Sequence, residues 1–142
     1  FGEPEKTKEV LIDGWFHTGD IGYFDEEGCL YPVERKKELL RYNEYNVFPS
    51  ELEEIINKID GVVSSCVVGV LDEPTGNDII HAFVIKDQKS ELSEEFLLEK
   101  FNGKVKEGEK IRGGLNFVDE FKQTATGKVD RREMRKIAEK MK

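Results

Sequence analysis

The sequence is poor in the residues that build disulfide frameworks and metal centres. It has two cysteines and two histidines, and neither pair lies at a spacing typical of metal ligands or of a disulfide-rich scaffold. No apolar run approaches the length of a membrane span, and the first ten residues are too charged for a signal peptide. These absences argue against a disulfide scaffold, a metal site and a transmembrane segment. We expect an intracellular protein whose thiols, Cys29 and Cys66, are buried or half-buried.

Charge is abundant but is not segregated. Of 142 residues, 30 are acidic and 22 are basic, which gives a formal net charge of -8. Both signs are interspersed, and this pattern argues against nucleic-acid binding. A chain of this length can bury roughly two-thirds of its unfolded surface, so it can form one domain, or a small domain with a piece of another. Because it starts at Phe1 without a methionine, we expect a fragment of a longer protein.

Residues 33–53 lie between two different hydrophobic patterns. After a polar, turn-rich start, the short apolar runs 21–24 and 29–33 flank the turn sequence 25–28, which predicts a β-hairpin. Pro32 places the second strand at a sheet edge or near its end. We therefore predict a hairpin before this stretch and a separate layer of structure after it.

Three segments after the hairpin have the caps and spacing of helices. Ser50 and Glu53 form an S-x-x-E capping box, and the apolar face that follows consists of Leu52, Ile55, Ile56 and Ile59. Ser93 caps a second helix, whose apolar residues are Phe96, Leu97, Phe101 and Val105. Asp130 with Glu133 begins a third, whose apolar face carries Met134, Ile137 and Met141. We expect its basic residues to form a solvated face.

Three β-branched or apolar runs predict strands. Residues 62–70 and 79–85 flank a turn-rich loop, so we expect them to pair antiparallel, and residues 115–118 are a third candidate. Strands that alternate with helices after residue 50 predict a small α+β layer structure. The predicted fold class is thus α+β, with an N-terminal β-hairpin followed by a roughly three-stranded sheet packed by helices.

Two loops carry candidate binding residues. Gly127-Lys128 resembles the end of a phosphate loop, but the Walker pattern would need Gly and Ser or Thr where Lys122 and Val129 stand. What remains is a lysine on a loop before a helix, which can present a cation to a phosphate or carboxylate or be an ordinary solvated side chain. Asp20 follows Thr18-Gly19 and can accept hydrogen bonds from sugar hydroxyls or cap its own turn.

In order along the chain, the motifs GWFHTGD (14–20), RKK (35–37), PSELE (49–53) and TGK (126–128) closely resemble the end of the adenylate-forming superfamily. That superfamily includes acyl- and aryl-CoA synthetases, coumarate–CoA ligases, beetle luciferases and adenylation domains of nonribosomal peptide synthetases. The sequence RGG (112–114) with FVDE (117–120) is similar to the luciferase and coumarate–CoA ligase branch. The resemblance covers nearly the whole chain.

The resemblance implies a domain division and roles for single residues. Residues 1–36 would be the tail of a large N-terminal AMP-binding domain, and residues 37–142 would be a mobile lid domain with Lys37 as the hinge. Asp20 and Arg35 match the residues that hold the ATP ribose. Lys128 matches the catalytic lysine that closes over the α-phosphate and the carboxylate.

The family reaction joins a carboxylic acid to AMP with release of pyrophosphate and then transfers the acyl group to CoA. The resemblance therefore implies ATP, Mg and CoA, with the Mg site in the large domain of the same chain, so we expect the fragment to be inactive alone. Four residues match the segment that lines the CoA path: Arg41, Tyr42, Glu44 and Tyr45. Glu44 stands where the family usually has a glycine, which predicts interference with the CoA half-reaction.

Two alternatives to a CoA ligase remain open at the level of sequence. One is an adenylation domain that serves a carrier protein, and the other is a non-catalytic descendant that binds nucleotide or acyl-adenylate. The localisation implied by the resemblance is cytoplasmic or peroxisomal. The chain ends in Met141-Lys142 and not in an S-K-L signal, so it gives no support to peroxisomal residence.

Overall fold

The computed structural model describes residues 2–141, and the chain forms two compact units, Phe1–Glu38 and Leu39–Lys142. The boundary between the units lies between Glu38 and Leu39, one residue after Lys37, which is the predicted hinge. That these units are a large-domain tail and a lid stays a prediction. The terminal residues Phe1 and Lys142, on which the expectations about the ends of the chain depend, lie outside the described part. Across residues 2–141, no helix combines the length and the apolar character needed to cross a membrane.

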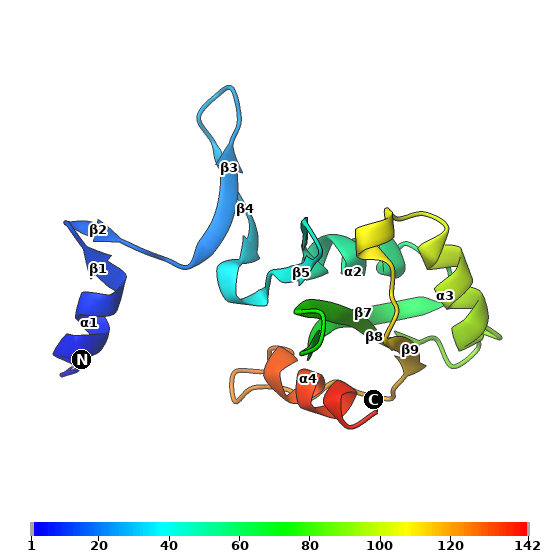
Figure 1. Ribbon diagram of the computed structural model, residues 1–142. Coiled ribbons are helices and arrows are strands. Elements are labelled where there is room, and N and C mark those ends of the chain that lie inside the picture. Colours follow the sequence, from blue (N-terminus) through cyan, green and yellow to red (C-terminus); the bar gives the residue numbers. More distant parts are fainter. Residues whose placement is uncertain (1, 142) are drawn as a thin grey trace. The chain divides into compact units, whose positions relative to one another are not determined.

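The first unit consists of short elements: α1 (Pro4–Val10), β1 (Leu11–Ile12), β2 (Trp15–Phe16), β3 (Asp20–Phe24), β4 (Leu30–Arg35) and the 3-10 helix η1 (Lys36–Glu38) (Figure 1). The sequence predicted no helix in the polar start, and α1 corrects that. Pro4 occupies the first turn, where a missing N–H costs nothing. Exposed ion pairs from Lys6 to Glu3 and from Lys8 to Glu5 connect successive turns.

The predicted hairpin is confirmed. Strands β3 and β4 pair antiparallel in a two-stranded sheet, with Asp20 opposite Arg35 at the open end. The closing turn is held by Asp25, whose carboxylate accepts hydrogen bonds from the backbone N–H of Cys29 at 2.8 Å and of Glu27 at 3.0 Å. Cys29 itself is exposed, so the expectation of a buried or half-buried thiol is wrong there and right only for Cys66. None of the described residues of the first unit is buried, so that unit has no packed layer to cover this thiol.

The first unit contributes no buried side chain among the residues described. Its large apolar side chains remain largely open, with Trp15 75 %, Phe24 70 % and Phe16 66 % exposed. The buried hydrophobic residues all lie from Leu40 onward. The second unit therefore has a core of its own, and the first unit does not.

The second unit is a three-stranded sheet with helices on both faces, which confirms the predicted α+β fold class (Figure 1). Its elements are β5 (Leu40–Tyr42), β6 (Tyr45–Val47), α2 (Pro49–Asn57), β7 (Val62–Asp72), β8 (Asn77–Lys86), α3 (Glu94–Asn102), the 3-10 helix η2 (Glu107–Glu109), β9 (Gly114–Phe117) and α4 (Arg131–Glu139). The sheet order is β7-β8-β9. Strands β7 and β8 pair antiparallel as predicted, and β9 pairs parallel to β8.

Alternation along β7 divides the core into two clusters, because successive side chains of a strand point to opposite faces. Val67 packs with α2 and α3 residues such as Ile56 and Phe101. Cys66 and Val68 pack on the other face against α4. The same cluster contains Val70, Phe83, Phe121, Met134 and Ala138. Helix α2 and helix α4 thus cover opposite faces of the sheet.

Two of the three predicted caps are present. Ser93 Oγ accepts from the N–H of Phe96, and Asp130 accepts from the N–H groups of Arg132 and Glu133. The capping box at Ser50 is wrong. Helix α2 begins at Pro49, and its N-cap is Phe48, which has no polar side-chain atom and makes no side-chain cap hydrogen bond. The Glu53 carboxylate accepts from the N–H of Val67 instead.

Some predicted core positions are also wrong. Phe96 is 54 % exposed and Met141 is 50 % exposed, although the helical spacing predicts both on apolar faces. Helix α4 ends at Glu139, so Met141 lies beyond its last turn. The Phe96 ring lies on the outer side of α3, where the Lys100 ammonium lies over it, 5.5 Å from the ring centroid.

Candidate functional site

Asp20 and Arg35 meet at the open end of the β3–β4 hairpin. Arg35 Nε lies 2.9 Å from Asp20 Oδ1, and Arg35 Nη1 donates to the carbonyl of Thr18 at 3.2 Å. The local turn is closed by another contact, since the N–H of Asp20 donates to Thr18 Oγ1 at 3.1 Å. Both charged side chains are partly exposed, at 58 % for Arg35 and 40 % for Asp20. The pair therefore orients a carboxylate that solvent can reach.

A pocket of about 390 Å³ adjoins this pair within the first unit and is lined by Thr18, Gly19, Arg35, Lys36 and Lys37. Gly19 adopts a φ of 74°, and its carbonyl accepts from the N–H of Lys36 at 2.8 Å, which closes the base of the hairpin. A carboxylate accepts hydroxyl hydrogen bonds and lysine and arginine side chains attract phosphate. The cations that line the pocket and the carboxylate of Asp20, which pairs with Arg35, together supply donor and acceptor types that a nucleotide requires.

The predicted CoA-path residues lie together on the β5–β6 hairpin. Its turn is formed by Asn43 and Glu44, and Asn43 has a φ of 52°, a conformation that asparagine tolerates. Asn43 N–H donates to Asn77 Oδ1 at 2.7 Å, and Arg41 N–H donates to Asp78 Oδ2 at 2.8 Å. The start of β8 therefore fixes one side of the hairpin.

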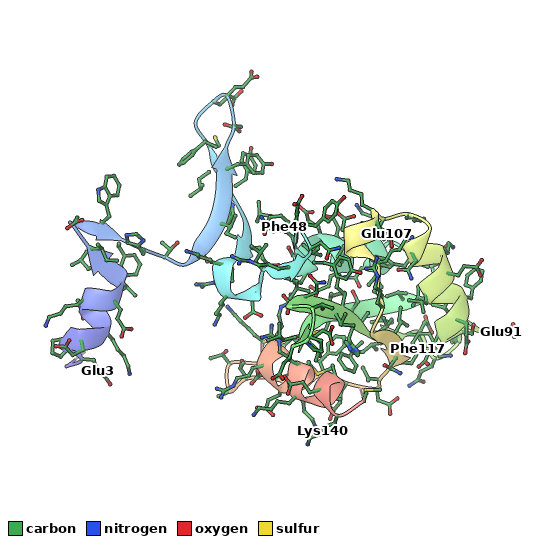
Figure 2. All side chains as sticks on the ribbon, in the orientation of Figure 1. Glu3, Phe48, Glu91, Glu107, Phe117 and Lys140 are labelled. Atoms are coloured by element: carbon green, nitrogen blue, oxygen red, sulfur yellow. The ribbon has the colours of Figure 1, made fainter. Side chains whose placement is uncertain are left out.

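Residues 107–112 fix its other side. The Arg112 guanidinium lies 4.1 Å from the ring centroid of Tyr42, and Tyr45 packs so closely on Gly108 that a Cβ there would lie 2.7 Å from the ring. Glu107, labelled on η2 in Figure 2, accepts from Arg112 Nη2 at 2.7 Å. The hydrogen bond from Lys110, and then that from Arg112, lowers the pKa of Glu107. Neither set of supports was evident from the sequence, because both join distant segments.

Lys128 lies in the lysine loop, residues 123–129, which precedes α4. Gln123 and Val129 form a β-bridge that closes the loop. Within it, the carbonyl of Lys128 accepts from the N–H of Thr124 at 2.8 Å, and Gly127 turns the chain with a φ of 79°. The side chain of Lys128 is exposed. The loop thus presents a solvent-accessible ammonium from a hydrogen-bonded backbone.

A pair that the sequence did not reveal, Glu53 and Arg131, joins α2 to the start of α4. Arg131 donates through Nη1 and Nη2 to the two carboxylate oxygens of Glu53, with Nη2 at 2.8 Å from Oε2. Arg131 Nη1 also donates to the carbonyl of Val67 at 3.2 Å, while the N–H of Val67 donates to Glu53 Oε1 at 2.7 Å. The expectation that the basic face of this helix is only solvated is therefore wrong at Arg131, which is 23 % exposed.

The predicted residues form three groups. Asp20, Arg35 and Lys37 belong to the first unit, and the β5–β6 hairpin and the lysine loop belong to the second. Within the second unit, the hairpin shares its core cluster with α2, whereas the lysine loop leads into α4 on the opposite face of the sheet. His17 and His81 join no such group, and residues 2–141 hold no cluster of three or more potential metal ligands.

Comparison with known proteins gives a consistent result. Residues 51–128 match the model of the AMP-binding enzyme C-terminal domain. The chain is 38% identical over 138 residues to luciferin 4-monooxygenase of Nipponoluciola cruciata, which covers 96% of this chain and 25% of that protein. It is 39% identical over 134 residues to 4-coumarate–CoA ligase 1 of Oryza sativa subsp. japonica, which covers 94% of this chain and 24% of that protein.

Among solved structures, ATP-bound MatB from Rhodopseudomonas palustris is similar, with a TM-score of 0.86 and 31% sequence identity. The match covers 96% of this chain and 27% of that one. The chain therefore spans about a quarter of the length of the curated relatives it matches.

Proposed function

The chain belongs to the adenylate-forming AMP-binding enzymes, within which it matches the C-terminal domain, and on this premise we propose that it is the C-terminal part of an ATP-dependent acid–thiol ligase. The whole protein would activate a carboxylic acid as acyl-AMP and transfer the acyl group to CoA. The observation that carries the proposal is the exposed Lys128 ammonium on a loop whose backbone is held by hydrogen bonds.

The nucleotide side of the site is the first unit. Asp20 would accept the hydrogen bonds of the ribose hydroxyls, and Arg35 keeps its carboxylate oriented through the 2.9 Å ion pair. Because one oxygen of Asp20 faces Arg35, the other is available to a hydroxyl donor. The cations of the adjoining pocket favour the phosphates of ATP. We propose that the Mg site lies outside this chain, which spans about a quarter of the length of the relatives it matches.

Adenylation brings two anions together, and Lys128 is the group that would offset their repulsion. The carboxylate oxygen attacks the α-phosphorus, an O–P bond forms, and the bond to pyrophosphate breaks. Negative charge develops on the phosphoryl oxygens during this step. An ammonium held near those oxygens stabilises the transition state more than the separated reactants, which is the condition for catalysis.

Thioester formation would use the opposite face of the second unit. The thiol sulfur attacks the acyl carbonyl, a C–S bond forms, and AMP leaves. We propose that the β5–β6 hairpin, through Arg41, Tyr42, Glu44 and Tyr45, lines the path of the thiol. The contacts with Asn77 and Arg112 would hold the hairpin in place along that path. Lys37, exposed in η1 beside the boundary between the units, would be the hinge that lets one unit serve both reactions.

The large exposed apolar surface of the first unit supports the proposal that residues 1–36 belong to a larger domain. Trp15, Phe16 and Phe24 are each more than half exposed, and several large apolar side chains left open in one small unit are typical of a surface that another part of the protein covers. We propose that the rest of an N-terminal domain covers them and that residues 37–142 are the lid. It follows that the 142-residue chain alone is inactive.

The test is an assay of the full-length protein with ATP and a series of medium-chain, long-chain and aromatic acids. We expect pyrophosphate release that depends on the acid, and an acyl thioester after CoA is added. Pyrophosphate without transfer to CoA, but with transfer to a carrier thiol, would identify a carrier-dependent adenylation domain instead. Binding of ATP without acid-dependent pyrophosphate release would contradict the ligase and indicate a non-catalytic protein.

A further inference from the structure

The Glu53–Arg131 pair lies at the base of the lysine loop and has no part in the chemistry described above. Arg131 is the first residue of α4, directly after the N-cap Asp130 and three residues after Lys128. The place where α4 begins therefore decides where the backbone of Lys128 can lie. Glu53 fixes that place from a helix on the other face of the sheet.

The contacts between Glu53 and Arg131 fix the orientation of the Arg131 guanidinium as well as its position. Two N–H groups of one planar guanidinium bind the two oxygens of one carboxylate, and such a fork fixes orientation as well as distance. β7 is the edge strand of the sheet, and the N–H and carbonyl of Val67 bind Glu53 and Arg131 respectively. Only 14 % of Glu53 and 23 % of Arg131 is exposed, so solvent ions screen the pair weakly.

Backbone hydrogen bonds within residues 122–130 connect the lysine loop tightly to the start of α4. The N–H of Asp130 donates to the carbonyl of Lys122 at 2.7 Å, which holds the end of the loop to its start. The bridge between Gln123 and Val129 follows, and inside it the Thr124–Lys128 bond closes the turn. A displacement of Arg131 would therefore move the lysine loop as one piece.

We propose that the Glu53–Arg131 pair is a positioning device for Lys128 in acyl-adenylate formation. This inference rests on the function proposed for Lys128. Neither member of the pair contacts substrate, and both act by setting the origin of α4 and hence the reach of the ammonium. The hydrogen bonds of the pair described above join α2, β7 and α4 and do not involve the β5–β6 hairpin, so we expect the thioester half-reaction to proceed without the pair.

The first test is Arg131→Met in the full-length protein. A misplacement of about 1 Å in a reacting group costs on the order of 10²-fold in rate, so we expect a loss of that size in single-turnover pyrophosphate release. Thioester formation from supplied acyl-adenylate should be unchanged. Arg131→Lys, which keeps the charge but not the fork, should lose less. The matched control is Arg132→Met, which removes an exposed neighbouring arginine and should leave both rates unchanged.

A double-mutant cycle with Lys128→Ala separates positioning from general loss of structure. If Arg131 acts through Lys128, Arg131→Met should have no further effect on pyrophosphate release once Lys128 is alanine. A merely structural role would lower the rate equally in both backgrounds. It would also lower both half-reactions together with the melting temperature.

The outcomes distinguish this inference from the function on which it rests. Selective loss of adenylation in Lys128→Ala, with additive or unselective loss in Arg131→Met, overturns the positioning role alone. Equal loss of both half-reactions in Lys128→Ala overturns the proposed role of Lys128, and the positioning role with it. Selective, non-additive loss in Arg131→Met supports both.

Discussion

Gly113 packs directly against the buried imidazole of His81. A Cβ at position 113 would lie 2.0 Å from His81 Nε2, a separation that no side chain can occupy, and His81 is only 2 % exposed. We predict that Gly113→Ala lowers the free energy of unfolding by about 1–3 kcal/mol through overpacking. Chemical denaturation of the 142-residue chain measures this value. Gly103→Ala is the control, because a Cβ there meets its nearest atom, the Glu99 carbonyl oxygen, at 3.4 Å.

The contacts of Glu107 predict that the stability of the chain depends on pH. The hydrogen bond from Lys110, followed by that from Arg112, lowers the pKa of Glu107 below its ordinary value of 4.5. Because the folded pKa is the lower one, the contacts stabilise the chain fully above that ordinary value, and this contribution is lost as the pH falls through the folded pKa. An NMR titration of the carboxyl carbon should give a midpoint below 4.5, and Lys110→Met should raise it. Lys104→Met, at an exposed position, is the control; an unchanged midpoint in Lys110→Met would contradict this cause.

Single residues also show where sequence reasoning stopped. The S-x-x-E pattern at Ser50 and Glu53 is a sound local signal for a cap, yet Glu53 binds Arg131, 78 residues away. No local spacing distinguishes a glutamate that caps its own helix from one that binds a distant arginine. Asp130 caps its helix as predicted, because both partners of that contact lie within three residues.

At the scale of elements, the β5–β6 hairpin carries the residue that departs from the resemblance. We predict that Glu44→Gly speeds thioester formation in the full-length protein and leaves pyrophosphate release unchanged. The reason is the repulsion between the Glu44 carboxylate and a negative charge of CoA. Two unit charges about 4 Å apart in water interact by about 1 kcal/mol, which corresponds to roughly a fivefold change in rate. The hairpin should persist, because Asn-Gly is a favoured two-residue turn.

Glu44→Gln separates charge from size in this experiment. It removes the negative charge and keeps a side chain of the same length. A gain in Glu44→Gln equal to that in Glu44→Gly would assign the effect to charge, and a gain in Glu44→Gly alone would assign it to the space near the backbone. No gain in either variant would contradict a role for Glu44 on the path of the thiol.

Elements whose evidence is local were predictable, and elements that depend on distant partners were not. The antiparallel pair β7–β8 follows from two β-branched runs joined by a short loop. The parallel pairing of β9 with β8 depends on the long connection through α3, and no residue of β9 encodes its direction. Likewise, the sequence identified the lysine loop but not the contacts by which residues 107–112 and Asn77 support the β5–β6 hairpin.

At the scale of the whole molecule, the two units differ in their capacity to fold. The buried hydrophobic residues belong to the second unit, whereas the first unit leaves its aromatic side chains open. We predict that residues 39–142 alone fold cooperatively, and that a peptide of residues 1–38 does not, because a two-stranded hairpin without a covered face is marginal in water. Circular dichroism and hydrogen exchange of the two pieces measure this. A cooperative thermal transition in the 1–38 peptide would contradict it.

The central claim is that this chain supplies the adenylation lysine of a ligase, and the two half-reactions of the full-length Lys128→Ala variant test it most directly. Loss of one preorganised donor costs about 3–4 kcal/mol of transition-state stabilisation, or on the order of 10²- to 10³-fold in rate. We predict a loss of this size in the rate of acyl-adenylate formation, measured as pyrophosphate release. Thioester formation from supplied acyl-adenylate should continue at the parent rate. An equal loss in both half-reactions, or no loss in the first, would contradict the claim.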